Sequence, residues 1–441
     1  MVVADFLCPV PRLLIKNAKA LVGTSRAGVN RLCGAEMAQL PKIEDGWLMA
    51  EDGRISALGP MSEFPGITDW SGLTVIDATG RYVLPGWCDP HTHTVFAAPR
   101  EEEFVDKIKG LSYQEIAARG GGILNSAMKL RAMDEEQLYT QSKARLEAMM
   151  AQGTVAVEIK SGYGLSLESE LKMLRVARRL KQEFPVQVKT TLLAAHALPP
   201  EYKEDRDGYL DLICNELIPR VAAEGLADFV DVFCETNYFS AAEMARVLDV
   251  GNKHGLPGKV HVNQFTSIGG IESAIRHGAL SVDHLEVMED SDIDALVGAM
   301  GANGPGSLGC PMPTLLPSCS FFLRIPYAPA RALIDRGLPV ALASDHNPGS
   351  TPSGNLNLVL SLACIQLRML PEEAIAALTL NAAAAMQLEG ELGSLTVGKR
   401  ASMIITQEVP SLAYLPYAFG SDHIDTVIHD GKPVRAGAAL L

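Results

Sequence analysis

The sequence lacks several features that define whole classes of protein. It has no continuous run of about eighteen apolar residues, so no segment is expected to span a membrane. Its first twenty residues have no basic start followed by an apolar core, which makes a secretory signal a poor interpretation. Basic residues are outnumbered, with 38 Lys and Arg against 52 Asp and Glu. The resulting formal charge of −14 argues against nucleic acid as a partner.

Cysteine is sparse and scattered. The eight cysteines never form a CxxC pair and stand at positions 8, 33, 88, 214, 234, 310, 319 and 364. Disulfide frameworks are typical of small secreted domains, so reduced thiols in a cytoplasmic protein are the simpler interpretation for 441 residues. A hydrophobic share of 47% and a charged share of 20% are ordinary for a globular protein. The length exceeds that of one usual compact domain, which favours a large domain and a smaller one.

Both ends of the chain have the pattern of a β domain. Short apolar runs alternate with Gly and Asp over the first eighty or so residues, and Asp52-Gly53 between two such runs indicates a hairpin. The last forty residues repeat this pattern with Asp430-Gly431. We therefore expect a small β-sandwich domain assembled from both termini, residues 1–84 and 389–441, around a central domain of residues 85–388.

The central part alternates apolar strands with amphipathic helices. Eight strands are predicted at 82–86, 154–160, 186–194, 228–233, 258–262, 280–284, a weak seventh after a glycine-rich run that ends at Cys310, and 339–344. Helices are predicted at 134–150, 168–183, 208–224, 240–254, 268–277, 290–300 and 328–336. Such alternation implies right-handed parallel units, and eight of them close into an α/β fold, the TIM-like (β/α)8 barrel.

Histidines and one aspartate gather where these strands end. His91 and His93 follow the first strand and His196 the third, whereas His261, His284 and Asp345 stand at the ends of the fifth, sixth and eighth. The active site of such a barrel lies at the carboxyl ends of its strands. We therefore expect these side chains to converge although they are far apart in the sequence.

The His91-Thr92-His93 motif indicates a metal site. Residues i and i+2 of an extended segment point the same way, so two imidazoles can bind one ion. Alone, such a pair is better explained as a surface or packed pair, but His261 and Asp345 at other strand ends favour a metal. Zinc and iron both fit, and a bound water molecule would lose a proton more easily and become the nucleophile. The fourth strand ends in Cys234-Glu235 and has no lysine that could bridge two ions, which favours a single metal.

We expect the remaining histidines to have structural roles rather than to take part in the site. His254, His277, His423 and His429 fall on predicted helices or in the β domain. His346 adjoins Asp345, but neighbouring side chains usually face different ways.

Eight segments resemble, in order, the imidazolonepropionase family of the amidohydrolase superfamily. They are LPGWCDPHTHTVFAAPREEEF, SYQEIAARGGGI, EIKSGYGL, AAHALPPEY, HVNQFTSIGG, VDHLE, TLLPSCSFFLR and ALASDHNPG. The resemblance runs from about residue 10 to residue 435. The paired histidines and the strand-end aspartate mark only the superfamily, whereas the runs around Arg100, Tyr113, Tyr163 and Asn347 are specific to this family.

The resemblance implies a function and a set of site residues. The family hydrolyses the ring of 4-imidazolone-5-propanoate to N-formimidoyl-glutamate in histidine degradation, with one zinc or iron ion per subunit, and its members are often dimers. By resemblance the metal ligands are His91, His93, His261 and Asp345. The implied substrate-binding positions are Arg100, Tyr113, Tyr163, His196, Asn347, Gly349 and Ser350. Arg100 suits a propanoate tail because a guanidinium binds a carboxylate through two hydrogen bonds.

The implied catalytic residues are His196, His284 and Asp345. His196 would polarise the ring carbonyl, and His284 would relay or orient a proton. Gln264 departs from part of the family, where some relatives carry glutamate. A glutamine amide does not titrate, so we expect Gln264 to hydrogen-bond to the ring and Asp345 or His284 to move the proton.

Two other functions stay open from the sequence. A related amidohydrolase that deaminates another small ring would share the metal ligands but would not need Arg100 and Tyr163. A scaffold barrel usually lacks part of the ligand set, which is complete here. The role of Cys234-Glu235 is also open, since the pair either lines the pocket or packs.

Overall fold

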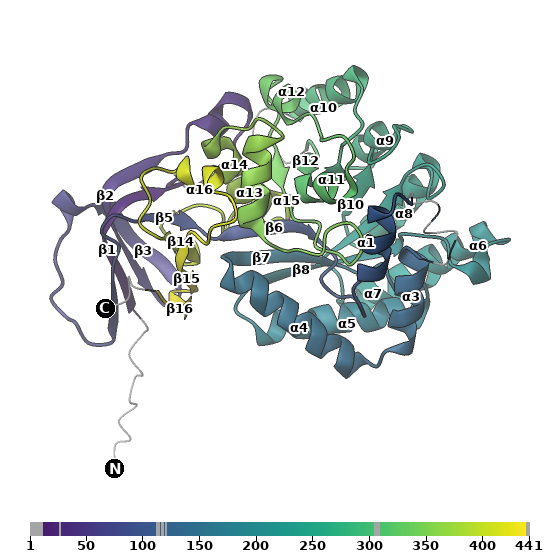
Figure 1. Cartoon of the computed structure of the whole chain (residues 1–441), viewed down its shortest axis with the longest axis horizontal. Helices are drawn as coiled ribbons and strands as arrows, with labels where there is room; N and C mark the ends of the chain where they lie inside the picture. Colours follow the sequence, from purple (N-terminus) through teal and green to yellow (C-terminus); the bar gives the residue numbers. More distant parts are fainter. Residues whose placement is uncertain are drawn as a thin grey trace, which may run out of the picture.

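The central domain is a closed barrel of eight parallel strands (Figure 1). The computed structural model describes residues 12–437 apart from 26–27, 112–114, 116–118, 120 and 304–308. In sheet order the strands are β6 (Trp87–Thr92), β7 (Thr154–Lys160), β8 (Gln187–Ala195), β9 (Phe229–Cys234), β10 (Gly258–Val262), β11 (Ser281–His284), β12 (Met312–Leu315) and β13 (Ala341–Leu342). A parallel bridge between Thr92 and His346 joins the last strand segment to the first. The (β/α)8 prediction is confirmed.

Helices cover the outside of the barrel because their apolar faces pack on the strands. Those between the first and last barrel strands are α1 (Glu101–Ile108), α3 (Ile123–Ala132), α4 (Glu135–Ala151), α5 (Leu167–Glu183), α6 (Arg206–Asp211), α7 (Ile218–Ala223), α8 (Ala241–Lys253), α9 (Gly270–Arg276), α10 (Asp290–Asn303), α11 (Pro317–Leu323) and α12 (Ala330–Asp335). After the barrel come α13 (Leu356–Ile365), α14 (Pro371–Leu378), α15 (Leu380–Ala385) and α16 (Tyr414–Tyr417). The expected helix 208–224 is interrupted by a π-helical turn at Leu212–Leu217.

The small domain combines strands from both ends of the chain, as predicted (Figure 1). Its strands are β1 (Arg12–Val22), β2 (Lys42–Glu51), β3 (Arg54–Pro60), β4 (Leu73–Asp77), β5 (Tyr82–Pro85), β14 (Met403–Thr406), β15 (Ile424–His429) and β16 (Lys432–Arg435). They are connected by hydrogen bonds into one sheet, because β1 pairs with β2 on one side and with β4 and β5 in succession on the other. Both Asp-Gly pairs turn hairpins with positive φ, 49° and 75° at Asp52 and Gly53 and 47° and 75° at Asp430 and Gly431.

The first predicted barrel strand belongs to the small sheet. Residues 82–85 form β5, which pairs with β1 and β14, and the barrel begins directly after Gly86, at Trp87. All four residues of β5 are buried, so an apolar run of this length fits either sheet, and periodicity alone does not distinguish them. His91 consequently lies inside the first barrel strand rather than after it.

No helix of the described residues is long and apolar enough to cross a bilayer.

Gly86 is the single residue between the two sheets, and its substitution tests how tightly they are joined. A Cβ atom at this position would lie 2.1 Å from Cγ1 of Val155. Gly86→Ala is therefore expected to cost about 2 kcal/mol and to lower the apparent melting temperature by roughly 4 °C. Gly298→Ala, in α10 with open space around it, is the control and should leave the melting temperature unchanged or slightly raised. Equal melting temperatures for the two variants would contradict the tight junction.

Candidate active site

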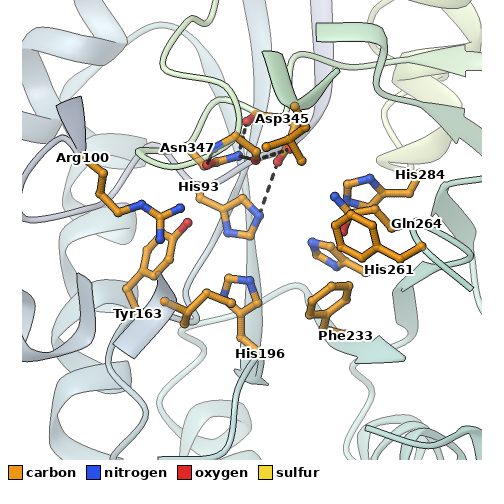
Figure 2. A pocket seen from close by; sticks show the side chains of 14 residues that line it. His93, Arg100, Tyr163, His196, Phe233, His261, Gln264, His284, Asp345 and Asn347 are labelled. Atoms are coloured by element: carbon orange, nitrogen blue, oxygen red, sulfur yellow. Dashed lines mark hydrogen bonds and ion pairs between the residues drawn. The ribbon is translucent and has the colours of Figure 1, made fainter. Parts of the chain in front are cut away.

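A polar pocket opens at the carboxyl ends of the barrel strands (Figure 2). About 450 Å³ lies between the atoms that line it, including the open solvent at its mouth. The lining residues are His93, Arg100, Ile123, Tyr163, His196, Phe233, His261, Gln264, Phe265, His284, Leu323, Asp345, Asn347 and Ser350. Most residues that the sequence singles out therefore converge here. Tyr113 lies outside the described residues.

Three histidines and one aspartate form a set that fits a metal ion. Each of His91, His93 and His261 offers one nitrogen, and the three nitrogens lie within 4.8 Å of one another. Oδ1 of Asp345 is 3.7 Å from Nε2 of both His91 and His93. Nε2 of His91 is buried and has no hydrogen-bond partner among the described residues, as expected of an atom that faces a ligand.

The protonation of the three imidazoles also suits a metal. Burial, followed by the positive charges of Lys160 and of neighbouring histidines, holds the pKa values of His91 and His261 well below the ordinary value. Burial and the adjacent His196 and His261 do the same for the pKa of His93. Neutral imidazoles are the form that binds metal ions, so these residues need no proton loss to act as ligands.

Two buried aspartates orient two of these histidines. Nδ1 of His91 lies 2.7 Å from Oδ2 of Asp283, and Nδ1 of His261 lies 2.9 Å from Oδ2 of Asp231. The Asp283 carboxylate accepts the Nδ1 proton of His91, which leaves the Nε2 lone pair of that ring for a ligand. The Asp231 carboxylate lies beside Nδ1 of His261 as an ion-pair partner, without a hydrogen bond between the two atoms. The sequence reasoning missed both aspartates. The sequence feature that could have revealed them is a charged residue within a short apolar strand, in DFVDVF for Asp231 and in LSVDH for Asp283.

His284 and Asp345 face the same pocket with shifted pKa values. Burial opposes the charge on His284, but the carboxylate of Glu286, 3.4 Å from its Nδ1, leaves the pKa of His284 raised. Burial raises the pKa of Asp345 to about 6. Both residues adopt positive φ, 88° and 56°, a costly backbone conformation that clusters at functional sites. A carboxylate and an imidazole with such pKa values can exchange protons near neutral pH.

His196 lies against His93 and is held by the main chain. Its ring stacks on that of His93 with centroids 5.3 Å apart, and its Nδ1 lies 2.9 Å from the carbonyl oxygen of Gly162. A carbonyl only accepts, so Nδ1 carries the proton. Burial lowers the pKa of His196 to about 4. The neutral ring therefore has an accepting Nε2, and the expected donation to a carbonyl oxygen would require a second proton.

Arg100 is a buried cation that packs on the loop after the last barrel strand. A Cβ atom on Gly349 would lie 1.0 Å from Nη2 of Arg100, so only glycine fits beneath the guanidinium. Nε and Nη1 of Arg100 are buried and have no hydrogen-bond partner among the described residues, although Oε2 of Glu103 lies 3.6 Å from Nε. A small anion in the pocket would satisfy these donors. Figure 2 shows Arg100 next to Tyr163 at one side of the pocket.

The loop that holds Gly349 is organised by Asn347. Oδ1 of Asn347 accepts hydrogen bonds from the backbone N–H groups of Gly349 (2.7 Å) and Ser350 (2.8 Å). Nδ2 of Asn347 donates to Oγ of Ser350 (2.6 Å), which donates to Oδ2 of Asp345 (3.1 Å). The amide expected to bind a substrate thus makes its hydrogen bonds within the loop, and it links Asp345 to the glycine under Arg100.

Glu235, whose role was open from the sequence, joins two loops at the rim. Its Oε2 accepts from the backbone N–H groups of Phe265 (2.8 Å) and Thr266 (3.1 Å), and its Oε1 accepts from that of Thr236 (2.7 Å). The Oγ1 hydroxyl of Thr266 also donates to Glu235. Cys234 is buried in the core. Glu235 therefore positions the segment that begins with Gln264, whose Nε2 donates to Sγ of Cys319 at 3.4 Å.

The histidines for which the sequence suggests a structural role do not line the pocket; they are His254, His277, His346, His423 and His429. His346 is buried beside Phe96, with ring centroids 6.0 Å apart, and its backbone takes part in barrel closure. His277 pairs with Asp249 at 2.7 Å on the outside of the barrel.

Comparisons with known proteins identify the family of this chain. A family model described as "Amidohydrolase family" matches residues 82–434. An imidazolonepropionase of Christiangramia forsetii is 53% identical over 420 residues, which are 95% of this chain and 99% of that protein. An imidazolonepropionase of Geobacillus thermodenitrificans is 43% identical over 426 residues, 96% of this chain and 97% of that protein.

Solved structures support the fold. The guanine deaminase of E. coli superposes with a TM-score of 0.71 at 16% identity, over 96% of this chain and 99% of that chain. An adenosine deaminase from Xanthomonas campestris with bound zinc has a TM-score of 0.68 at 15% identity, over 97% of this chain and 94% of that chain. At these identities the likeness shows the fold alone.

Glu235→Ala tests the link between the two rim loops. The loss of its accepted hydrogen bonds should ease local opening by about 1–2 kcal/mol, so amide exchange at Phe265 and Thr266 should become about tenfold faster. Hydrogen–deuterium exchange of peptides covering residues 263–268 measures this. Glu147→Ala, at an exposed position on α4, is the control and should leave these peptides unchanged. Equal exchange in both variants would show that other contacts hold the rim.

Proposed function

Because the chain belongs to the amidohydrolase family and, within it, to the imidazolonepropionases, it is a C–N hydrolase that opens the ring of 4-imidazolone-5-propanoate in histidine degradation, and we propose that the pocket described above performs this reaction. The observation that carries the assignment of the pocket is that Arg100, with buried donors lacking hydrogen-bond partners among the described residues, lines the same cavity as the histidine cluster. A substrate with a carboxylate tail and a hydrolysable ring would occupy both parts at once.

We propose that His91, His93, His261 and Asp345 hold one zinc or iron ion. The neutral imidazoles, the orienting aspartates and the solitary Nε2 of His91 support this ligand set. When bound, such an ion supplies Lewis acidity for activating water and polarising a carbonyl group.

Substrate recognition falls to the chain's own polar groups. In this proposal Arg100 binds the propanoate through its guanidinium, and Tyr163 and Ser350 line the cavity beside it. Nε2 of His196 accepts a hydrogen bond from an N–H group of the substrate ring. Gln264, whose Nε2 donates to Cys319, offers its carbonyl oxygen as a second acceptor for the ring. Asn347 and Gly349 act by shaping the surface on which Arg100 lies.

Proton transfer is proposed for Asp345 and His284. A carboxylate whose pKa is raised to about 6 can accept a proton from the attacking water at neutral pH. His284, with its pKa raised and its Nδ1 next to Glu286, can deliver a proton from Nε2 to the departing ring nitrogen. The amide of Gln264 takes no part in this transfer.

We also propose that the enzyme works in the cytoplasm as a homodimer and has no nucleic-acid partner. The free state of the seven cysteines in the described part of the chain supports a reducing compartment, and the excess of acidic residues argues against binding nucleic acid.

The function is tested by turnover and metal content measured on one purified sample. The expected result is about one zinc or iron ion per chain, loss of the substrate's ultraviolet absorbance and formation of N-formimidoyl-glutamate, seen by mass spectrometry. His261→Ala should lose the metal and at least ~10³-fold in kcat/KM, because a ligand of the activating ion is gone. Metal binding without turnover of this substrate, but with turnover of a neutral ring, would favour a deaminase instead.

Arg100→Met and Gly349→Ala should produce the same defect. Either change removes the guanidinium from its position, so KM for the carboxylated substrate should rise ~10- to 100-fold. A neutral analogue with the tail carboxylate esterified should be turned over equally by both variants and the unmodified enzyme. Arg179→Met and Gly390→Ala, at exposed or open positions away from the pocket, are matched controls. An unchanged KM in both site variants would assign the tail to another residue.

A further inference from the structure

Five ionisable residues are buried inside the barrel beneath the histidines. The charged cluster consists of Glu158 and Lys160 on β7, Asp231 on β9, Lys259 on β10 and Asp283 on β11. None is more than 1% exposed. Each stands at an alternate position of an otherwise apolar strand, and since the barrel helices cover the outside, these side chains point into the barrel.

Lys160 is the centre of this charged cluster. Its Nζ lies 2.7 Å from Oε1 of Glu158, 2.8 Å from Oδ2 of Asp231 and 3.8 Å from Oδ2 of Asp283. Lys259 is more distant, with its Nζ 3.5 Å from Oε2 of Glu158 and 4.0 Å from Oδ2 of Asp283. Lys259 also donates to Oγ of Ser281 at 2.7 Å. Lys160 is therefore the cation that contacts all three carboxylates.

Stability does not account for the charged cluster. The removal of five charges from water costs several kcal/mol per ion, and apolar residues of the same volume often stabilise a core as well or better. Three carboxylates against two ammonium groups also leave a formal excess of one negative charge. This excess lies directly below the proposed cation site, where it would favour a positive ion.

The charged cluster connects directly to two proposed metal ligands. Oδ2 of Asp231, the atom that contacts Lys160, also lies 2.9 Å from Nδ1 of His261. Oδ2 of Asp283 likewise lies 2.7 Å from Nδ1 of His91. One ammonium group thus lies within 4 Å of both carboxylate oxygens that contact the two rings.

We propose that Lys160 is a positioning residue of the metal site, which holds Asp231 and Asp283 so that His261 and His91 present their Nε2 atoms before the ion arrives. This role rests on the metal site of the proposed function. Lys160 contacts no substrate and acts only through the two aspartates, and Lys259 supports it from the far side of Glu158.

The test compares metal affinity in matched variants. Lys160→Met alone leaves the Glu158 carboxylate without its nearest cation and can prevent folding. The double variant Lys160→Met/Glu158→Gln removes one charge of each sign, so the charged cluster keeps its net charge while Asp231 loses its ammonium partner. Lys399→Met is the control, because Lys399 is also buried but donates to Leu392 and Ser394 and has no ion pair with the charged cluster among the described residues.

Two measurements on metal-free protein decide the outcome. Competition with a chromogenic chelator gives the dissociation constant for Zn²⁺, and the visible absorption of Co²⁺-loaded protein reports the geometry of the ligands. We expect the double variant to bind Zn²⁺ about 10- to 100-fold more weakly, with an altered Co²⁺ spectrum. We expect Lys399→Met to lower the melting temperature with both readouts unchanged.

A folded double variant with the unmodified protein's Zn²⁺ affinity and Co²⁺ spectrum would overturn the positioning role and leave the proposed function intact. If the unmodified protein itself bound no Zn²⁺, the proposed metal site and this inference would fall together. The single variant Glu158→Gln keeps Lys160 and should bind Zn²⁺ more tightly than the double variant, because Asp231 retains its partner. An equal loss of affinity in the single and double variants would assign the effect to Glu158 and also overturn the positioning role.

Discussion

The closure of the barrel is the contact on which the site depends. Two backbone hydrogen bonds join the first strand to the segment after the last one, from the Asp345 N–H to the His91 carbonyl (3.1 Å) and from the His93 N–H to the His346 carbonyl (2.8 Å). The same seam that makes the sheet continuous therefore brings the aspartate beside the two paired histidines. The positive φ of Asp345 turns its side chain toward them at a backbone cost that the closed barrel sustains.

From this seam the polar groups extend in two directions. Below it, the orienting aspartates and Lys160 connect the imidazoles to the interior of the barrel. Above it, Ser350 and Asn347 connect Asp345 to Gly349, against which Arg100 packs. The residues proposed to hold the ion and the loop against which Arg100 packs are thus connected through Asp345, by hydrogen bonds on the loop side and by the backbone seam on the histidine side.

Much of this could be predicted from the sequence, for identifiable reasons. The barrel follows from alternating strands and helices, and the convergence of His91, His261 and Asp345 follows from their place at strand ends. The assignment of residues 82–85 failed because a short buried run fits either sheet. The charged residues inside the strands, such as Lys160, were overlooked because a lone charge in an apolar run does not reveal its partners on other strands. The packing of Gly349 against Arg100 joins residues about 250 positions apart and depends on distances that no motif contains.

The small sheet has a consequence for how the chain is made. Strand β5 gains its neighbour β14 through pairs such as Pro85 with Met403, about 320 residues later in synthesis. During translation β1 to β5 can assemble early, but one edge of β5 keeps its backbone groups unpaired until the whole barrel has emerged from the ribosome and β14 follows it. Gly86 leads directly from β5 into β6, the strand that carries His91. The first histidine of the site is therefore synthesised directly after the strand whose edge is paired last. The sheet is therefore completed only after the barrel has been synthesised, when β14 to β16 add to the free edge of β5.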